Sequence, residues 1–308
     1  MEATMDRTPG AMMGTGTGTG TGAAGGAAAD AVIRVGGLRK AYRDVVAVDG
    51  VDLEVRAGEV FALLGPNGAG KTTVTEILEG FRTADSGQVE VLGVDPATAG
   101  QEWRARIGVV LQAAGDFNEI TVEEVLRHFA HYYPNPRRVP ELIEEVGLTE
   151  KRKTRTGLLS GGQRRRLDVA LGLIGRPELL FLDEPTTGFD PAARRKFWEL
   201  ISRLRDGGTT ILLTTHYLDE AEHLADRVGV LARGRLVDLD TPAHLGGRQQ
   251  AQATVRWRDG RGEHEEVTAD PGALVAALYG ELGDAMSELS VTRPSLEDIY
   301  LTMIGEQS

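Results

Sequence analysis

The sequence contains no cysteine, which excludes disulfide bonds and metal sites built on thiolates. Long apolar runs are also missing, since no stretch approaches the roughly 20 residues that a membrane-spanning helix needs, and no signal-peptide core precedes a cleavage site. We therefore expect a cytoplasmic chain that reaches a membrane only through a partner. The 34 lysines and arginines are outnumbered by 46 aspartates and glutamates, for a net charge of −12. This balance disfavours nucleic acid as a partner.

The first 30 residues differ in composition from the rest of the chain. They are rich in glycine, alanine and threonine and include an alternating Gly-Thr tract over 14–22. Such a segment buries too little apolar surface to offset the entropy of ordering. We predict a disordered tail over residues 1–30. The full length of 308 residues suits one large or two modest domains.

The stretch from Gly58 to Gly80 carries the strongest functional pattern. Its apolar run Val60–Leu64 predicts a buried strand, and residues 72–78 predict a helix. The loop between them fits G-x-x-x-x-G-K-[ST] and consists of Gly65, Pro66, Asn67, Gly68, Ala69, Gly70, Lys71, Thr72 and Thr73. Glycines let consecutive backbone N–H groups turn inward around an anion. The stretch predicts a nucleotide phosphate site, and a glycine-rich turn without a ligand is the alternative.

Three side chains near this loop suit a bound nucleotide. Lys71 can reach the β- and γ-phosphates, and the Thr72 hydroxyl can ligate Mg²⁺, while the dipole of the following helix adds positive potential. Tyr42 lies upstream, between strands predicted over 32–35 and 51–55. Its ring could stack on adenine, although a half-buried strand residue is the plainer interpretation.

Further polar residues follow buried strands or open a helix. Apolar strands predicted over 107–111, 179–182 and 210–215 are followed by Gln112, by Asp183 and Glu184, and by His216. An acid at the carboxyl end of a strand can hold Mg²⁺ through water, and the second acid lies where an attacking water would need a base. A helix predicted over 164–175 is opened by Leu159, Ser160, Gly161, Gly162 and Gln163. This helix start suits an anion, but an ordinary glycine-rich cap would look the same.

Two other regions complete the expected architecture. Helices predicted over 121–133 and 139–146 form a helical insertion at about 113–165, and Glu123 and Glu124 are expected on its exposed face. Beyond residue 247, short strands alternate with a helix over 271–282 and a last helix, which predicts a small α+β appendage over 248–308.

Over about residues 32–247, this ordered set of motifs resembles the ATP-binding cassette (ABC) ATPases. The resemblance implies an α/β fold: a P-loop NTPase core with an antiparallel β subdomain and an α-helical insertion, as an ABC domain over 31–247. It also implies ATP and Mg²⁺ as cofactors. Phe189 stands where the family more often has leucine, and we expect little consequence because both are apolar.

The resemblance further implies a role for each matched residue. Tyr42 stacks adenine, the loop 65–73 holds phosphates, and Thr72, Gln112 and Asp183 surround the metal. Glu184 is the general base, Lys71 stabilises charge, and His216 contacts the γ-phosphate. Residues 160–163 serve the ATP of a second copy, so that a homodimer forms two shared sites.

A narrower resemblance concerns the class of transporter. The stretches 159–190, 214–222 and 293–301 are similar to ATPase subunits of bacterial drug-resistance exporters of the daunorubicin-resistance type. This implies a peripheral protein on the inner face of the cell membrane that powers efflux of a drug-like, antibiotic or lipid substrate through a separate permease. The alternatives are a soluble ABC ATPase acting on ribosomes or DNA, and a scaffold that binds nucleotide without hydrolysis, which Glu184 disfavours.

Overall fold

The computed structural model describes residues 31–110 and 117–305, and its centre is a six-stranded sheet of strand order β5-β6-β7-β3-β8-β9. The first five strands of that order run parallel, and β9 pairs antiparallel with β8. The strands are β3 (Val60–Leu64), β5 (Ile107–Val110), β6 (Leu179–Asp183), β7 (Thr210–Thr215), β8 (Arg227–Ala232) and β9 (Arg235–Asp240). The predicted α/β core is confirmed, and β8 and β9 add to the strands that the sequence pattern predicts.

Both faces of this sheet are buried, as β3 illustrates. All five of its side chains are buried. Val60, Ala62 and Leu64 belong to one hydrophobic cluster, whereas Phe61 and Leu63 belong to the other. Because successive side chains point to opposite faces of a sheet, a strand between two cores reads as a continuous apolar run. Each large aliphatic side chain buried in this way contributes roughly 1.5–3 kcal/mol.

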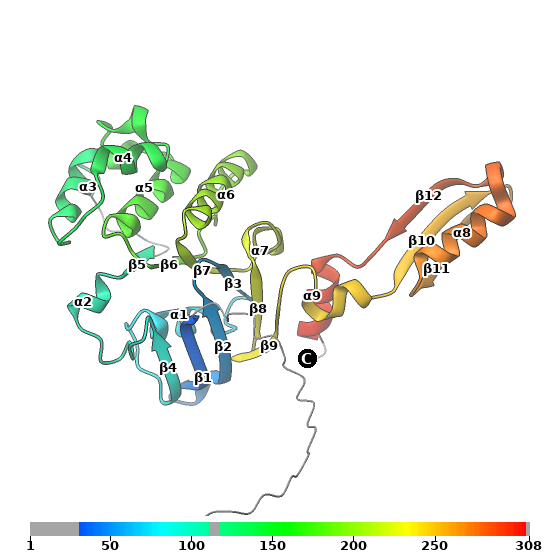
Figure 1. Cartoon of the computed structure of the whole chain (residues 1–308), viewed down its shortest axis with the longest axis horizontal. Helices are drawn as coiled ribbons and strands as arrows, with labels where there is room; N and C mark the ends of the chain where they lie inside the picture. The colour runs from blue at the N-terminus through cyan, green and yellow to red at the C-terminus, as the bar shows by residue number, and fades with distance from the viewer. Residues whose placement is uncertain (1–30, 111–116, 306–308) are drawn as a thin grey trace, which may run out of the picture.

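Helices and a second sheet cover the core (Figure 1). The helices beside it are α1 (Lys71–Leu78), α5 (Gly161–Leu173), α6 (Pro191–Asp206) and α7 (Leu218–Leu224). The predicted antiparallel β subdomain is a three-stranded sheet of order β2-β1-β4, made of β1 (Ala31–Tyr42), β2 (Val45–Arg56) and β4 (Ser86–Val91). Buried side chains of α1 and of this sheet share one hydrophobic cluster.

The helical insertion contains α3 (Val122–Ala130) and α4 (Val139–Glu145), after the short α2 (Gln101–Arg104). The N-terminus of α3 is a capping box, in which Thr121 Oγ1 accepts from the Glu124 backbone at 3.3 Å and the Glu124 carboxylate accepts from the Thr121 backbone at 2.8 Å. Glu123 pairs with Arg152 at 2.5 Å, and its side chain is only 14% exposed. The expectation that Glu123 lies on an exposed face is therefore wrong, because an arginine far along the chain covers it.

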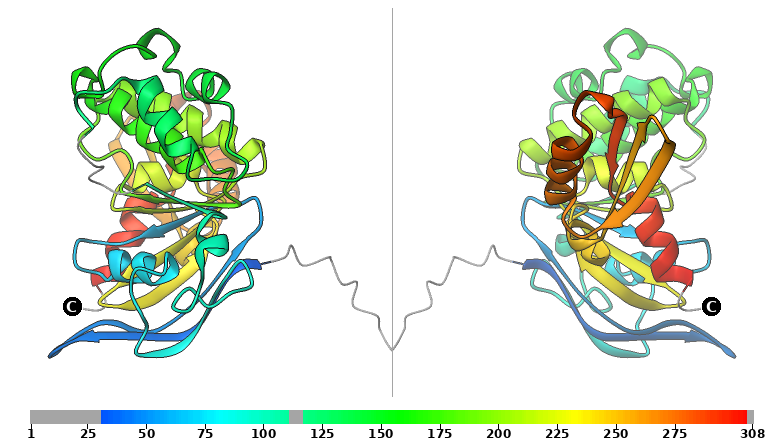
Figure 2. Two further views of the ribbon diagram at one scale, coloured as in Figure 1. Left: turned by 90° about the vertical axis from the view of Figure 1, so that its left-hand side faces the viewer. Right: turned by 90° about the vertical axis from the view of Figure 1, so that its right-hand side faces the viewer.

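The C-terminal part contains a small sheet of order β11-β10-β12 with one helix; Figure 1 shows it extending away from the main body, and Figure 2 views it end-on. Its elements are β10 (Ala253–Asp259), β11 (Gly262–Thr268), α8 (Pro271–Leu282) and β12 (Ser287–Thr292). The last helix, α9 (Leu296–Gly305), lies within the range 248–308 predicted for the appendage but packs against the main body. Its buried Leu296 and Tyr300 pack into the main hydrophobic core. Among the described residues, no helix combines the length and apolar character needed to cross a bilayer.

Candidate functional site

The carboxyl ends of three neighbouring strands meet at one edge of the central sheet. Parallel pairing sets Leu64 of β3 opposite Thr215 of β7, and Asp183 of β6 opposite Thr214 of β7. The loop after β3, the acids after β6 and His216 after β7 therefore emerge together. In open α/β sheets, this edge is where ligands bind.

The loop over residues 65–70 needs its glycines for two reasons. Gly68 and Gly70 have φ angles of 80° and 106°, which side chains with a Cβ rarely adopt. At Gly65 a Cβ would lie 2.3 Å from the backbone oxygen of Leu231, and at Gly70 it would lie 2.4 Å from that of Ala47. Gly70 caps α1 without a side chain, so the first N–H groups of the helix remain able to bind an anion.

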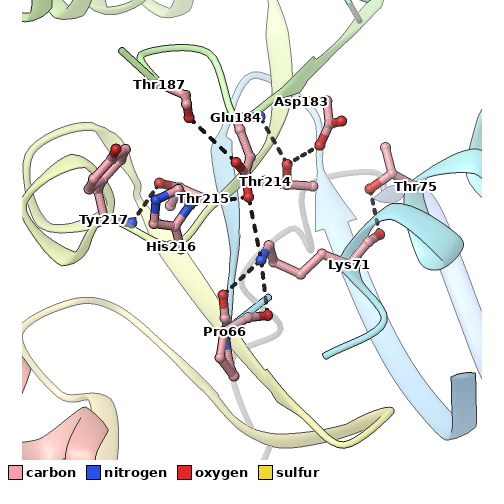
Figure 3. A network of polar contacts seen from close by, with 11 residues as sticks. Pro66, Lys71, Thr75, Asp183, Glu184, Thr187, Thr214, Thr215, His216 and Tyr217 are labelled. Atoms are coloured by element: carbon pink, nitrogen blue, oxygen red, sulfur yellow. Dashed lines mark hydrogen bonds and ion pairs between the residues drawn. The ribbon is translucent and has the colours of Figure 1, made fainter. Parts of the chain in front are cut away.

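Lys71 is buried, with 6% of its side chain exposed, and points into the loop (Figure 3). Its Nζ donates to the backbone oxygens of Gly65 at 2.7 Å and Pro66 at 3.2 Å. The same Nζ lies 3.6 Å from Oε1 of Glu184. Burial lowers the pKa of Lys71, and the nearby Glu184 carboxylate opposes that shift. A buried ammonium at this place can interact with phosphate oxygens or with Glu184.

Glu184 lies between two cationic or potentially cationic groups (Figure 3). Its Oε1 is 3.1 Å from Nδ1 of His216, a distance that suits an ion pair although the two groups are not aligned as a hydrogen bond. Its backbone N–H donates to Oγ1 of Thr214 at 3.1 Å. The φ angle of Glu184 is 41°, a strained value for a residue with a side chain. The structure thus brings the predicted residues Lys71, Glu184 and His216 together.

Thr214 is a contributor that the sequence motifs do not single out. Its hydroxyl donates to Oδ1 of Asp183 at 2.5 Å while accepting from the Glu184 backbone. One side chain of β7 therefore contacts both acids at the carboxyl end of β6, the Asp183 carboxylate and the Glu184 backbone. A fully buried threonine near the carboxyl end of β7 was the available signal, because a buried hydroxyl needs a partner.

The residues proposed to hold a metal fit Mg²⁺ in their chemistry. No group of three or more His, Asp or Glu able to hold a metal occurs in the described part of the chain. Mg²⁺ does not require one, since it typically takes one or two carboxylates and completes its shell with water and substrate phosphates. Asp183 supplies a carboxylate, and the exposed Thr72 a hydroxyl at the start of α1. Gln112 falls outside the described residues.

The residues that open α5 form a separate group. Ser160 and Gln163 make a capping box, with a contact of 3.1 Å from the Ser160 backbone to the Gln163 side chain. Ser160, Gly162 and Gln163 line a pocket of about 250 Å³ together with Asp190 at the start of α6. Within the described residues, no hydrogen bond or ion pair joins positions 160–163 to the loop 65–73. Their predicted role toward the nucleotide of a second copy stays a prediction.

Tyr42 is the last residue of β1 and is 37% exposed. Nζ of Lys40 and Cζ of Arg82 lie 5.6 and 5.4 Å from the centre of its ring. These distances suit cation–π interactions. An exposed ring at a strand end suits base stacking, and this role also stays a prediction.

Comparison with known proteins gives a consistent result. A family model described as "ABC transporter" matches residues 48–187. The daunorubicin resistance ATP-binding protein DrrA2 of Streptomyces coeruleorubidus is 38% identical, over 90% of this chain and 96% of its own. Nod factor export ATP-binding protein I of Rhizobium sp. (strain N33) is also 38% identical, over 89% of this chain and 97% of its own.

Solved structures show the same likeness in the fold. The structure of cbiO1 from Clostridium perfringens, described as part of the ABC transporter complex cbiONQ, gives a TM-score of 0.65 at 28% identity and covers 70% of this chain and 90% of its own. A dimeric post-hydrolysis structure of the ATP-binding cassette MJ0796 with ADP and Pi gives 0.61 at 22% identity, over 68% of this chain and 98% of its own. The second likeness concerns the fold alone.

Proposed function

This chain belongs to the ABC transporter ATPases, and we propose that it is the ATP-hydrolysing subunit of an exporter, with Glu184 as the general base. The observation that carries the proposal is the position of the Glu184 carboxylate, which lies 3.6 Å from Lys71 and 3.1 Å from His216 at the edge of the sheet where the phosphate loop ends. A base and two groups that can stabilise negative charge therefore converge on one place.

The side chains divide the work of phosphoryl transfer to water. The loop N–H groups and Lys71 bind the phosphates, and Lys71 stabilises the charge that develops on the transferred group. Glu184 accepts a proton from the attacking water, and His216 contacts the γ-phosphate. Thr214 fixes the orientations of the two acids separately. Its hydroxyl donates to the Asp183 carboxylate, and its hydroxyl oxygen accepts from the Glu184 backbone N–H. Mg²⁺ bound at Thr72, Asp183 and Gln112 would neutralise phosphate charge.

We infer a homodimer from the separation of the two glycine-rich elements. Ser160, Gly162 and Gln163 line their own pocket beside α6, so a second copy is needed to place them against a nucleotide in the loop 65–73. The relatives named above are ATP-binding proteins of daunorubicin resistance and Nod factor export. By analogy we propose a separate permease, a position at the inner face of the membrane, and a drug-like, antibiotic or lipid cargo.

Replacing Glu184 with glutamine tests the proposal. Glutamine keeps the size of the side chain but cannot take a proton, so we expect ATP turnover to fall about 10²–10⁴-fold while ATP binding persists. Size-exclusion chromatography with Mg-ATP should then show an accumulated dimer. The matched control is Glu178→Gln just before β6, where the carboxylate pairs with Arg106 at 2.6 Å. Near-normal turnover by the Glu184 variant would contradict the assignment.

A further inference from the structure

A single arginine holds the backbone on both sides of the proposed base. Arg165 lies on α5, and only 6% of the residue is exposed. Its Nη2 donates to the backbone oxygen of Asp183 at 2.6 Å, and its Nε donates to that of Pro185 at 3.2 Å. The two accepting carbonyl groups belong to the residues before and after Glu184, so one guanidinium spans the turn in which Glu184 lies.

The turn at Glu184 needs such support. Its φ of 41° falls in the left-handed region, which residues with a Cβ populate only when the surroundings fix them there. A guanidinium suits this task because it is planar and its donors form a rigid fork. Two of these donors set the directions of two carbonyl groups, and thereby the orientation of the residue between them.

The direction of the Glu184 side chain depends on that turn. Its Oε1 lies within 3.1 Å of His216 and 3.6 Å of Lys71, and neither contact would survive a large rotation of the backbone at Glu184. The backbone of this residue has two further anchors: its N–H group donates to Oγ1 of Thr214 at 3.1 Å, and its carbonyl oxygen accepts from the Thr187 backbone at 3.3 Å. Thr214 holds the turn from the side of β7, whereas Arg165 holds it from the side of α5.

We propose that Arg165 is a positioning residue for ATP hydrolysis, which keeps the Glu184 carboxylate in the place where it can accept a proton from water. The inference rests on the proposed role of Glu184. A positioning role differs from a purely structural role in packing α5 against the sheet. Loss of a structural contact would affect stability and nucleotide binding as much as the chemical step.

The first test compares Arg165→Lys with a control at another arginine that contacts the backbone, away from the proposed site. Lysine keeps the charge but cannot bridge both carbonyl groups in one plane. The control is Arg106→Lys, since Arg106 also donates to a backbone oxygen, that of Leu92 at 3.1 Å, and pairs with Glu178 at the opposite end of β6. A misplacement of about 1 Å at a reacting group can cost about 10²-fold. We therefore expect kcat to fall about 10- to 100-fold in Arg165→Lys, with the Kd of a fluorescent ATP analogue changed less than about twofold.

The control should change neither quantity by more than about twofold. Equal kcat values for the two variants would overturn the proposal, and so would a parallel loss of binding in Arg165→Lys. Melting temperatures are measured for both. If Arg165→Lys does not fold, Arg165→Gln replaces it, because the amide can donate to one carbonyl group only. The same selective loss of kcat is expected, and an unchanged kcat would count against the proposal.

The second test asks whether Arg165 acts through Glu184. Single-turnover hydrolysis is measured for Glu184→Gln alone and for Glu184→Gln combined with Arg165→Lys. Residues that act as a unit show strongly non-additive effects, so the second change should lower the residual rate by less than about twofold. A further loss of about 10-fold or more would show that Arg165 acts independently and would overturn the inference. Failure of the proposed function is recognised separately, as near-normal turnover by Glu184→Gln alone.

Discussion

Glu79 offers a quantitative test of the electrostatics behind the phosphate loop. It follows α1, is 5% exposed, and has a pKa raised from the ordinary 4.5 to about 8, mainly by burial and further by the carboxylates of Asp183 and Glu76. Between these two values, the folded protein keeps a proton that the unfolded chain has lost. Stability should therefore fall as the pH rises from about 4.5 to 8, and the loss should be complete above pH 8.

The magnitude follows from the two pKa values. Between pH 6 and pH 9, ionisation of Glu79 should remove roughly 2–3 kcal/mol from the free energy of unfolding, at about 1.4 kcal/mol for each pKa unit. Glu79→Gln keeps the shape of the side chain and cannot ionise. We expect the variant to melt at a higher temperature than the wild type at pH 9, and this advantage should exceed that at pH 6 by roughly 3–6 °C.

The assay is thermal unfolding of both full-length proteins at pH 6 and pH 9 in the same salt. The difference between them cancels the contributions of all other titrating groups to a first approximation. Glu178→Gln is the control, because hydrogen bonds from Arg106 lower the pKa of Glu178 and its carboxylate stays ionised across this range. A melting difference for Glu79→Gln that is the same at both pH values would refute the reasoning.

Two further predictions concern packing and the shared site. Gly108→Ala should lower the melting temperature by roughly 2–6 °C, because its Cβ would lie 2.3 Å from the backbone oxygen of Gly172 and overpacking costs about 1–3 kcal/mol. Gly36→Ala, where a Cβ meets nothing within 4 Å, should leave the melting temperature nearly unchanged. Mixing Gly162→Asp with Lys71→Ala chains should restore some of the ATP-dependent dimerisation that each variant lacks alone, as judged by size-exclusion chromatography. The absence of any recovery, at every mixing ratio, would argue against a site shared between copies.

Local sequence patterns were sufficient for the buried strands and for the residues around them. The uninterrupted apolar runs of β3 and β6 were predicted because both faces of the sheet are covered. The helix predicted over 271–282 agrees with α8 at both ends. There, Asp270 caps the first turn at 3.0 Å and Gly283 follows the last. In each case the information lies within a few residues of the element.

Contacts between distant segments were not accessible in the same way. Glu123 was expected on the exposed face of the helical insertion, yet Arg152 covers it from 29 residues further along. In β8, Gly229 interrupts an apolar strand, and glycine weakens a strand pattern. Its Cβ would lie 3.0 Å from the ring of Phe61 on β3, so the glycine is explained by a neighbour that the local sequence does not reveal.

The geometry around Glu184 shows what such contacts mean for function. The sequence motif identifies the acid, but its orientation depends on Thr214 of β7 and Arg165 of α5, which contact the backbone around it. Neither contacting side chain needs to touch the nucleotide for its loss to slow hydrolysis. Substitutions that disturb this turn should therefore reduce kcat before they weaken ATP binding, whereas substitutions in the loop 65–73 should weaken binding itself. The two kinds of variant can be separated by measuring Kd and kcat on the same protein, because the proposed phosphate-binding groups lie in the loop, whereas Thr214 and Arg165 are proposed to act only through the orientation of Glu184.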